Sequence, residues 1–138
     1  FNTSKLTSMS LAFASNSSLE YIKGLNTQSV TSMNYLCNAC NMLTDVNTLD
    51  LSNIKSINNP FNGCRKLANI SFVELSIKVS ISFSSSPLLS NESIQSIING
   101  LADLTGQTAQ TITFHSDVKN KLTEEQIASA TSKNWNIA

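Results

Sequence analysis

Three cysteines are the residues of this chain that could bind a metal ion or carry redox chemistry. Cys37 and Cys40 have the Cys-x-x-Cys spacing of half a zinc site or of a redox pair. A structural zinc ion needs four ligands, so Cys64 and the single histidine, His115, would have to come from distant parts of the chain. A redox pair would need a strand followed by a helix, which the surrounding sequence does not predict. We therefore expect no metal ion and no cofactor.

His115 is the side chain best suited to act as a general base near neutral pH. Base catalysis would also need a nucleophile and an orienting acid, and Ser116 and Asp117 are only sequence neighbours whose side chains need not converge. A role for Ser116 or Asp117 at the start of a helix is the simpler interpretation. The remaining carboxylates are scattered and form no calcium-loop pattern. The sequence predicts no catalytic residue, and we expect the protein not to be an enzyme.

A repeat of 24 residues organises the first half of the chain. Six positions of each copy are apolar, and some polar positions also recur, as in Thr7-Ser8-Met9 and Thr31-Ser32-Met33. A repeat of this length predicts a solenoid, in which each unit buries its apolar face against its neighbours. The repeated apolar residues are Phe1, Leu6, Met9, Phe13, Leu19 and Ile22; Leu25, Val30, Met33, Cys37, Leu43 and Val46; and Leu49, Ile54, Ile57, Phe61, Leu67 and Ile70.

The repeat also gives the cysteines a structural interpretation. Cys37 shares its repeat position with Phe13 and Phe61, so we expect it in the core. Cys40 and Cys64 occupy equivalent positions of adjacent copies, which neighbouring turns would place about 5 Å apart, within disulfide range. Buried free thiols are the main expectation. A Cys40–Cys64 disulfide is the alternative.

Residues 1–76 hold the three copies, and each copy predicts the same two elements. A short strand is expected late in each copy, around Glu20–Lys23 in the first. Apolar residues three or four apart in the middle of each copy predict one or two turns of α- or 3₁₀-helix. These middle segments are Met9–Ala14, Met33–Ala39 and Ile57–Gly63.

Residues 77–138 follow a different pattern. The alternation from Ile77 to Phe83 predicts a strand buried on one face, within a shortened or transitional repeat over residues 77–89. Residues 90–138 are expected to form an α/β capping unit. Its elements are a helix capped by Ser90 or Asn91, a strand at Thr111–Phe114, a helix opened by a capping box at Thr123, and a strand at Asn134–Ile137. Trp135 is expected to close the core of the last turn rather than to stand exposed as a binding anchor.

The composition limits the partners. Nine acidic and nine basic residues cancel, and no basic stripe is present for phosphate contacts, so nucleic acid is disfavoured. No apolar run approaches the roughly 18–20 residues that cross a bilayer, so no membrane insertion is expected. Ser, Thr and Asn make up 52 of the 138 residues while charged residues make up 13%, which suits a sharply turning backbone and an exterior protein. The oligomeric state is not predicted.

Several segments resemble BspA-type leucine-rich repeats. Residues 2–9 and 26–33 resemble the T-S-x-V-T-x-M element of that family, and Asn62–Leu67 resembles its x-G-C-x-x-L element. Residues 86–94, 104–108 and 134–138 are similar to the end unit of many such proteins. The resemblance implies an α/β leucine-rich repeat solenoid, with one short parallel strand per repeat and an α/β C-terminal cap. Pro60 and the broken register after Ser76 depart from the pattern.

The resemblance also implies a class of function. Such proteins are surface-exposed or secreted bacterial proteins used for adhesion, or recognition or structural parts of a bacteriophage tail or tail-like particle. The implied location is extracellular or on the cell surface, with a virion tail as the alternative. The family is not enzymatic and has no fixed set of binding residues. Because Phe1 occupies the repeat position of Leu25 and Leu49, we also expect further repeats upstream.

The candidate binding residues follow from the repeat. Equivalent positions of a solenoid form a ladder, which is an extended surface. The strand positions between core residues should face outward, where they could bind a protein or glycan on another cell surface. Simple solvation of this polar ladder is an equally open alternative. The ladder consists of Glu20, Tyr21 and Lys23; Thr44, Asp45 and Asn47; and Ala68, Asn69 and Ser71.

Overall fold

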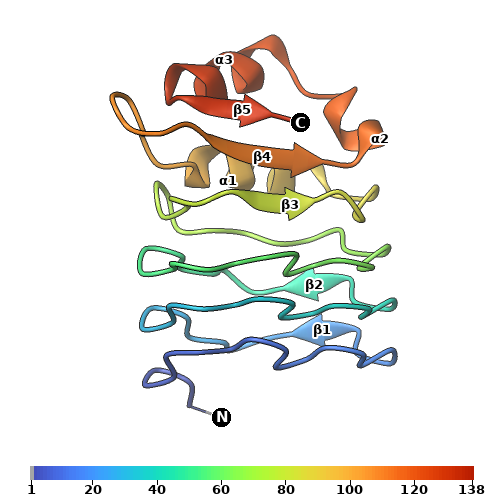
Figure 1. Cartoon of the computed structure of the whole chain (residues 1–138). Helices are drawn as coiled ribbons and strands as arrows, with labels where there is room; N and C mark the ends of the chain where they lie inside the picture. The colour runs from blue at the N-terminus through green and yellow to red at the C-terminus, as the bar shows by residue number, and fades with distance from the viewer. Residues whose placement is uncertain (1) are drawn as a thin grey trace.

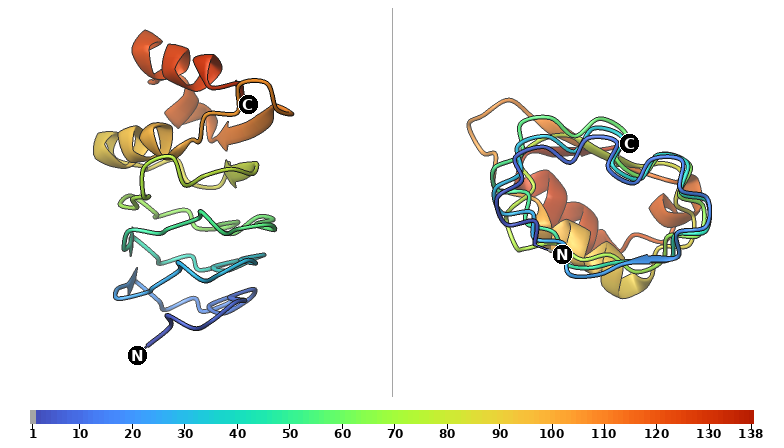
Figure 2. Two further views of the ribbon diagram at one scale, coloured as in Figure 1. Left: turned by 90° about the vertical axis from the view of Figure 1, so that its left-hand side faces the viewer. Right: turned by 90° about the horizontal axis from the view of Figure 1, so that it is seen from below.

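The computed structural model describes residues 2–138, and the chain winds into a stack of turns (Figure 1). Phe1, predicted to lie in the core, falls outside the described residues. Each turn is a flattened ring, so the stack has two long sides that lie across the core from each other (Figure 2). We call the side with the parallel bridges Ser8↔Ser32↔Ser56 the front side, and the side with Tyr21 and its partners the back side.

The back side carries the predicted strands of the first two copies. The strands β1 (Tyr21–Ile22) and β2 (Asp45–Val46) pair in parallel with Tyr21 opposite Asp45. A further parallel bridge joins Asp45 to Asn69 in the third copy. The prediction of a strand around Glu20–Lys23 is confirmed, and equivalent residues of successive copies lie side by side.

The helix α1 (Asn91–Gly100) takes the place of the next strand on the back side (Figure 1). Its serine side chains bond to the strand segment below it. The Ser93 hydroxyl accepts from the N–H of Ile70 and the Ser96 hydroxyl from the N–H of Phe72, both at 2.9 Å. These bonds satisfy N–H groups that an open strand edge would expose, so α1 ends the back ladder.

The middle of each copy does not form the predicted helix. Residues 10–15 and 34–39 form consecutive turns. The N–H groups of Met9 and Leu11 donate to carbonyls of the next turn rather than to their own, over 2.9 Å. Leu11 and Ser15 adopt left-handed backbone conformations with φ of 61° and 63°. In the first two copies alternate N–H groups are used between turns, so they are not available for the hydrogen bonds of a helix.

On the front side a second parallel sheet continues the stack. It consists of β3 (Ile81–Phe83), β4 (Gln110–Phe114) and β5 (Trp135–Ile137), in that order. The strand predicted from Ile77 to Phe83 forms only over its last three residues. Ile77 pairs instead with Leu101, whereas Ile81 pairs with Ile112 of β4. The two residues have different partners because the chain passes to the front side between Ile77 and Ile81.

The predicted capping-unit elements are present. The Ser90 side chain caps α1, and α3 (Glu124–Ser132) begins with a capping box between Thr123 and Gln126. A short helix α2 (Ser116–Lys119) lies between β4 and α3. Within residues 2–138, no helix has the length and apolar character that crossing a bilayer requires.

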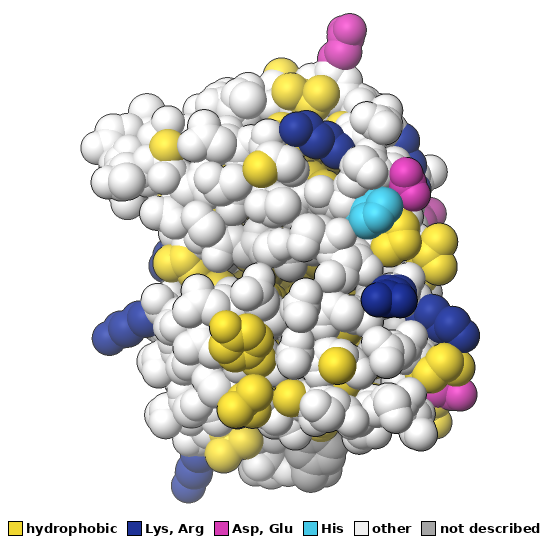
Figure 3. Space-filling model, turned by 45° about the vertical axis from the view of Figure 1, so that its right-hand side comes forward, with side chains coloured by type: hydrophobic (Ala, Val, Ile, Leu, Met, Phe, Trp, Pro, Cys, Tyr) yellow, Lys and Arg dark blue, Asp and Glu magenta, His cyan; other side chains and the backbone are white. Residues whose placement is uncertain are grey.

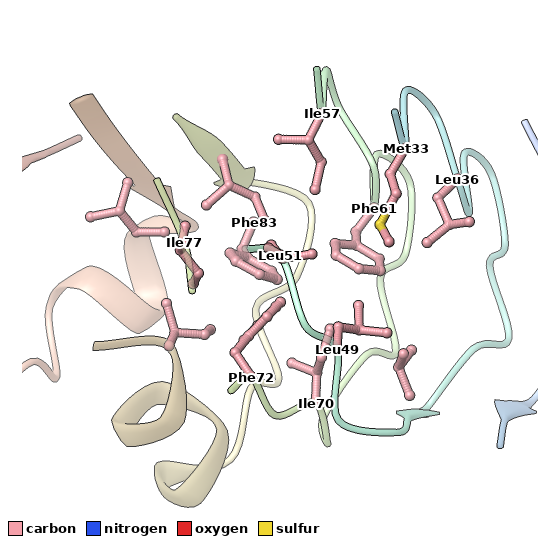
Figure 4. Packing of buried hydrophobic residues seen from close by; sticks show 14 of the residues in the cluster. Met33, Leu36, Leu49, Leu51, Ile57, Phe61, Ile70, Phe72, Ile77 and Phe83 are labelled. Carbon is pink, nitrogen blue, oxygen red and sulfur yellow. The ribbon is translucent and has the colours of Figure 1, made fainter. Parts of the chain in front are cut away.

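One hydrophobic core runs through the stack (Figure 4). All predicted core positions of the second and third copies are buried. In the first copy Leu6 is 46% exposed, and Phe13 and Leu19 are only partly buried, because no described turn lies beyond them. Trp135 is 2% exposed, and its indole N–H donates to the carbonyl of Ala102 over 2.9 Å. It is thus a core residue, as predicted.

Candidate functional site

Three residues of the predicted ladder lie in one row on the back side. Tyr21 is opposite Asp45, and Asp45 is bridged to Asn69. Tyr21 is 58% exposed. The Asn69 amide donates to the Asp45 carboxylate over 2.9 Å, which fixes the orientation of both side chains. The structure therefore brings together an aromatic ring, a carboxylate and an amide on one surface.

The Asp45 carboxylate is held in its charged form. The Thr44 hydroxyl and the Asn69 amide both donate to it, and these bonds lower the pKa of Asp45 below its usual value. Lys23 adds a smaller effect in the same direction. Asp45 consequently offers a fixed negative charge at neutral and mildly acidic pH.

Lys23 and Glu20 complete the exposed part of the row. The Lys23 ammonium lies 5.0 Å from the centroid of the Tyr21 ring, within cation–π range. Glu20 is exposed beside it. Glu20, Tyr21, Lys23, Thr44, Asp45 and Asn69 thus form one surface with charges of both signs around a tyrosine, which we call the Tyr21 surface.

Two predicted ladder residues are engaged in internal contacts instead. The Asn47 amide accepts from the N–H of Leu25 over 3.1 Å and donates to its carbonyl over 2.9 Å, so it joins two turns. The Ser71 hydroxyl bonds to that of Thr48 over 2.7 Å. The repeat gave no signal for the role of Asn47, because the equivalent residues are Lys23 and Ser71.

A shallow hollow of about 210 Å³ borders the Tyr21 surface where α1 begins. Asn69 and Ser71 line it from the ladder, and Ser90, Glu92 and Ser93 line it from the start of α1. The Ser90 and Ser93 hydroxyls already bond to each other and to backbone groups. The hollow extends the surface without adding a reactive group.

The three cysteines are free and buried. The Cys40 thiol donates to the carbonyl of Phe13 over 3.0 Å, and the Cys64 thiol donates to that of Cys37 over 3.1 Å. Burial raises the pKa of all three thiols, that of Cys64 to about 12. The main expectation of buried free thiols is met, and the alternative disulfide is not formed.

We expect the native protein to be inert to thiol reagents. Thiolate forms poorly in a buried site and reagent access requires opening of the fold, so reaction with Ellman's reagent should be about a thousandfold slower than in the denatured chain. Because burial raises the pKa values of Cys37 and Cys64 well above 9, the thiolate fraction of the native protein stays small from pH 7 to pH 9, so the native reaction should remain far slower than that of the denatured chain at either pH. Denaturation without reductant should release three reactive thiols, whereas a single remaining thiol would reveal a disulfide.

His115 has a structural role at the start of α2. Its Nδ1 accepts a hydrogen bond from the N–H of Asp117 over 3.2 Å, so the histidine itself caps the helix rather than Ser116 or Asp117. The Asp117 carboxylate lies 3.6 Å from the same nitrogen and is largely exposed. Among residues 2–138, no three His, Cys, Asp or Glu side chains gather in a way that could hold a metal ion.

Comparison with known families identifies the repeat region. The model of a family described as "Mycoplasma protein of unknown function, DUF285" matches residues 1–86, more than half of the chain. The chain belongs to the DUF285 family. The matched residues of this DUF285 protein include the whole Tyr21 surface and end just after β3. No curated protein and no solved structure matches the chain.

Proposed function

We propose that this DUF285 protein is a non-enzymatic recognition module of a bacterial surface or secreted protein. In this proposal its turns are BspA-type leucine-rich repeats, and it mediates adhesion by binding a protein or glycan on a host or neighbouring cell. The Tyr21 surface is the proposed site of contact. The observation that carries the proposal is the alignment in one row of an exposed Tyr21, a half-buried Asp45 and an exposed Asn69.

The chemistry of this row suits recognition of a protein partner. Tyrosine contributes a large contact area at a small entropy cost, and it is enriched among residues that dominate binding energy. Lys23 of the first turn and Asp45 of the second lie in adjacent turns, so they offer a positive and a negative charge for orienting a partner. The row is also built on hydrogen-bonded strands rather than on a loop, so binding would cost little conformational entropy.

A pull-down from surface-labelled host or neighbouring cells should capture a partner of the intact chain. Tyr21→Ala should weaken this binding by about thirtyfold, the effect of a tyrosine that contributes about 2 kcal/mol. Asp45→Asn should slow association and reduce its salt dependence, because it removes a charge and keeps the shape. Affinity and rates can be measured by surface plasmon resonance.

Tyr35→Ala is the matched control, since Tyr35 is another exposed tyrosine and its N–H bonds to the front side at Asn58. It should leave the binding of this partner unchanged. Retention of full affinity by both Tyr21→Ala and Asp45→Asn would show that the Tyr21 surface is not the site. A saturable hydrolytic activity lost in His115→Ala would contradict the non-enzymatic assignment.

A further inference from the structure

The hydrogen-bonded ladder on the front side is interrupted between the third turn and β3. In the first turn the N–H of Leu11 donates to the carbonyl of Asn34, and in the second the N–H of Tyr35 donates to that of Asn58, both over 2.9 Å. The equivalent N–H in the third turn, that of Asn59, makes no backbone hydrogen bond to a described residue. The stacked backbones therefore separate at this level.

Behind the interruption the core remains closed. Phe61 of the third turn and Phe83 of β3 stack with ring centroids 5.5 Å apart, and Phe72 contacts Phe83 edge to face (Figure 4). The separation therefore creates a feature of the surface and leaves no hole in the core.

A hollow of about 180 Å³ lies at the interruption. No charged residue is among those that line it. Its polar side chains come from the third turn on one side of the break, from the segment of β3 on the other side, and from β4. They are Asn58, Asn59, Ser80, Ser82, Thr111 and Thr113.

Much of the hydrogen-bonding capacity of this hollow is unused. The side-chain amides of Asn58 and Asn59 and the hydroxyls of Thr111 and Thr113 make no hydrogen bond to another described residue, and the hydrogen bonds of these four residues use their backbone groups. Each amide can donate and accept, and so can each hydroxyl. A ligand for this site should therefore both donate and accept hydrogen bonds and carry no charge.

An exposed apolar column leads into the hollow from below. Leu11 is 60% exposed and Tyr35 is 41% exposed, and Asn59 occupies the equivalent position of the third turn. All three have left-handed backbones, with φ of 61°, 56° and 46°. Such conformations cost bulky residues about 1 kcal/mol or more, and they gather at binding sites. Figure 3 shows hydrophobic side chains over the lower turns, among largely uncharged atoms.

A neutral sugar chain has the chemistry that this surface requires. Its hydroxyls donate and accept, it carries no charge, and the C–H face of a sugar ring packs against an aromatic ring. An anionic ligand would need a cation, and none lines the hollow. An extended peptide would bond mainly to backbone groups, and it would leave unused the side-chain amides and hydroxyls that line the hollow.

We propose that the hollow and the Leu11–Tyr35 column bind a neutral oligosaccharide. One sugar ring packs on Tyr35, and its hydroxyls bond to the amide of Asn59 and the hydroxyl of Thr113. The site lies across the core from the Tyr21 surface. The oligosaccharide proposal rests on the proposed recognition role of the protein. It adds a class of ligand and a second binding surface.

Saturation-transfer NMR with neutral oligomers of glucose, mannose and N-acetylglucosamine would test this proposal on the intact chain. At least one oligomer should bind. Tyr35→Ala should weaken it about tenfold through loss of the ring contact, and Thr113→Val about tenfold through loss of a hydrogen bond at constant shape. Asn59→Asp should also weaken it, since it replaces donor hydrogens with a charge. Ile127→Ala on α3, which belongs to neither surface, is the control and should bind as the parent does. Tyr21→Ala is measured beside it to test the back side.

Each contrary outcome separates the two proposals. Absence of binding to every neutral oligomer, or equal binding by Tyr35→Ala and Thr113→Val, overturns the oligosaccharide site. If a partner is still captured through Tyr21 in either case, the proposed function stands without this site. Loss of oligosaccharide binding in Tyr21→Ala alone would move the sugar to the back side and also overturn the inference. Circular dichroism should show unchanged folding of Tyr35→Ala and Thr113→Val, because both side chains reach the surface.

Discussion

Removal of residues 90–138 is expected to leave a chain that aggregates or loses its cooperative unfolding transition. The deletion removes β4 from the edge of β3 and removes the α1 serines from the N–H groups of Ile70 and Phe72. It also uncovers the apolar face beneath them, to which Ile81 and Phe83 contribute. Uncovering about 400 Å² of apolar surface at about 25 cal/mol per Å² costs on the order of 10 kcal/mol. A small domain has about 5–15 kcal/mol of stability in total.

Analytical ultracentrifugation and thermal melting followed by circular dichroism would measure this effect. Deletion of residues 1–24, one complete period, is the matched control. It exposes one turn end in place of another, so it should shorten the stack and leave a cooperative transition. A chain ending at Leu89 that stayed monomeric and melted cooperatively near the parent temperature would show that residues 90–138 are an independent domain.

Trp135→Ala is expected to produce the largest loss of stability of any single substitution on β5. Trp135 is the largest fully buried side chain, and its indole N–H donates to the carbonyl of Ala102. Truncation leaves a cavity and an unpaired buried carbonyl, and such changes cost about 3–5 kcal/mol. The free energy of unfolding should fall by this amount in urea titrations, with an unchanged dependence on urea concentration.

Two control variants would separate the causes. Trp135→Phe keeps most of the volume and loses the hydrogen bond, so it should cost less than Trp135→Ala. Ile127→Ala removes a 41% exposed side chain from the neighbouring α3 and should change stability by less than about 1 kcal/mol. A Trp135→Ala variant as stable as the parent would show that β5 is not part of the cooperative core.

The starts of α1 and α3 could be predicted because their determinants lie within a few residues of each other. Ser90 bonds to the N–H of Ser93, and Thr123 and Gln126 form a reciprocal capping box. The strand positions were also predictable, because the period places Tyr21 beside Asp45 whatever the detailed path of each turn. In both cases the residues that interact can be identified from the sequence pattern alone.

The middle segments were mispredicted for a physical reason. Apolar spacing of three or four residues occurs in helices, but it also occurs here in consecutive turns whose alternate N–H groups bond to the next turn. Those acceptors lie 23 residues away, so no local pattern distinguishes the two structures. The same holds for Ile77, whose partner in the adjacent turn, Leu101, became evident only from the structure.

The candidate sites divide in the same way. The sequence by itself determined the 24-residue period, and with it the core positions of the second and third copies and the row of Tyr21, Asp45 and Asn69. Only the tertiary structure decided that Asn47 is engaged between turns and that the front ladder breaks at Asn59. A period fixes which residues are equivalent, because each turn repeats the last. Departures from equivalence depend on how neighbouring turns fit, and that fit is set by contacts between distant residues.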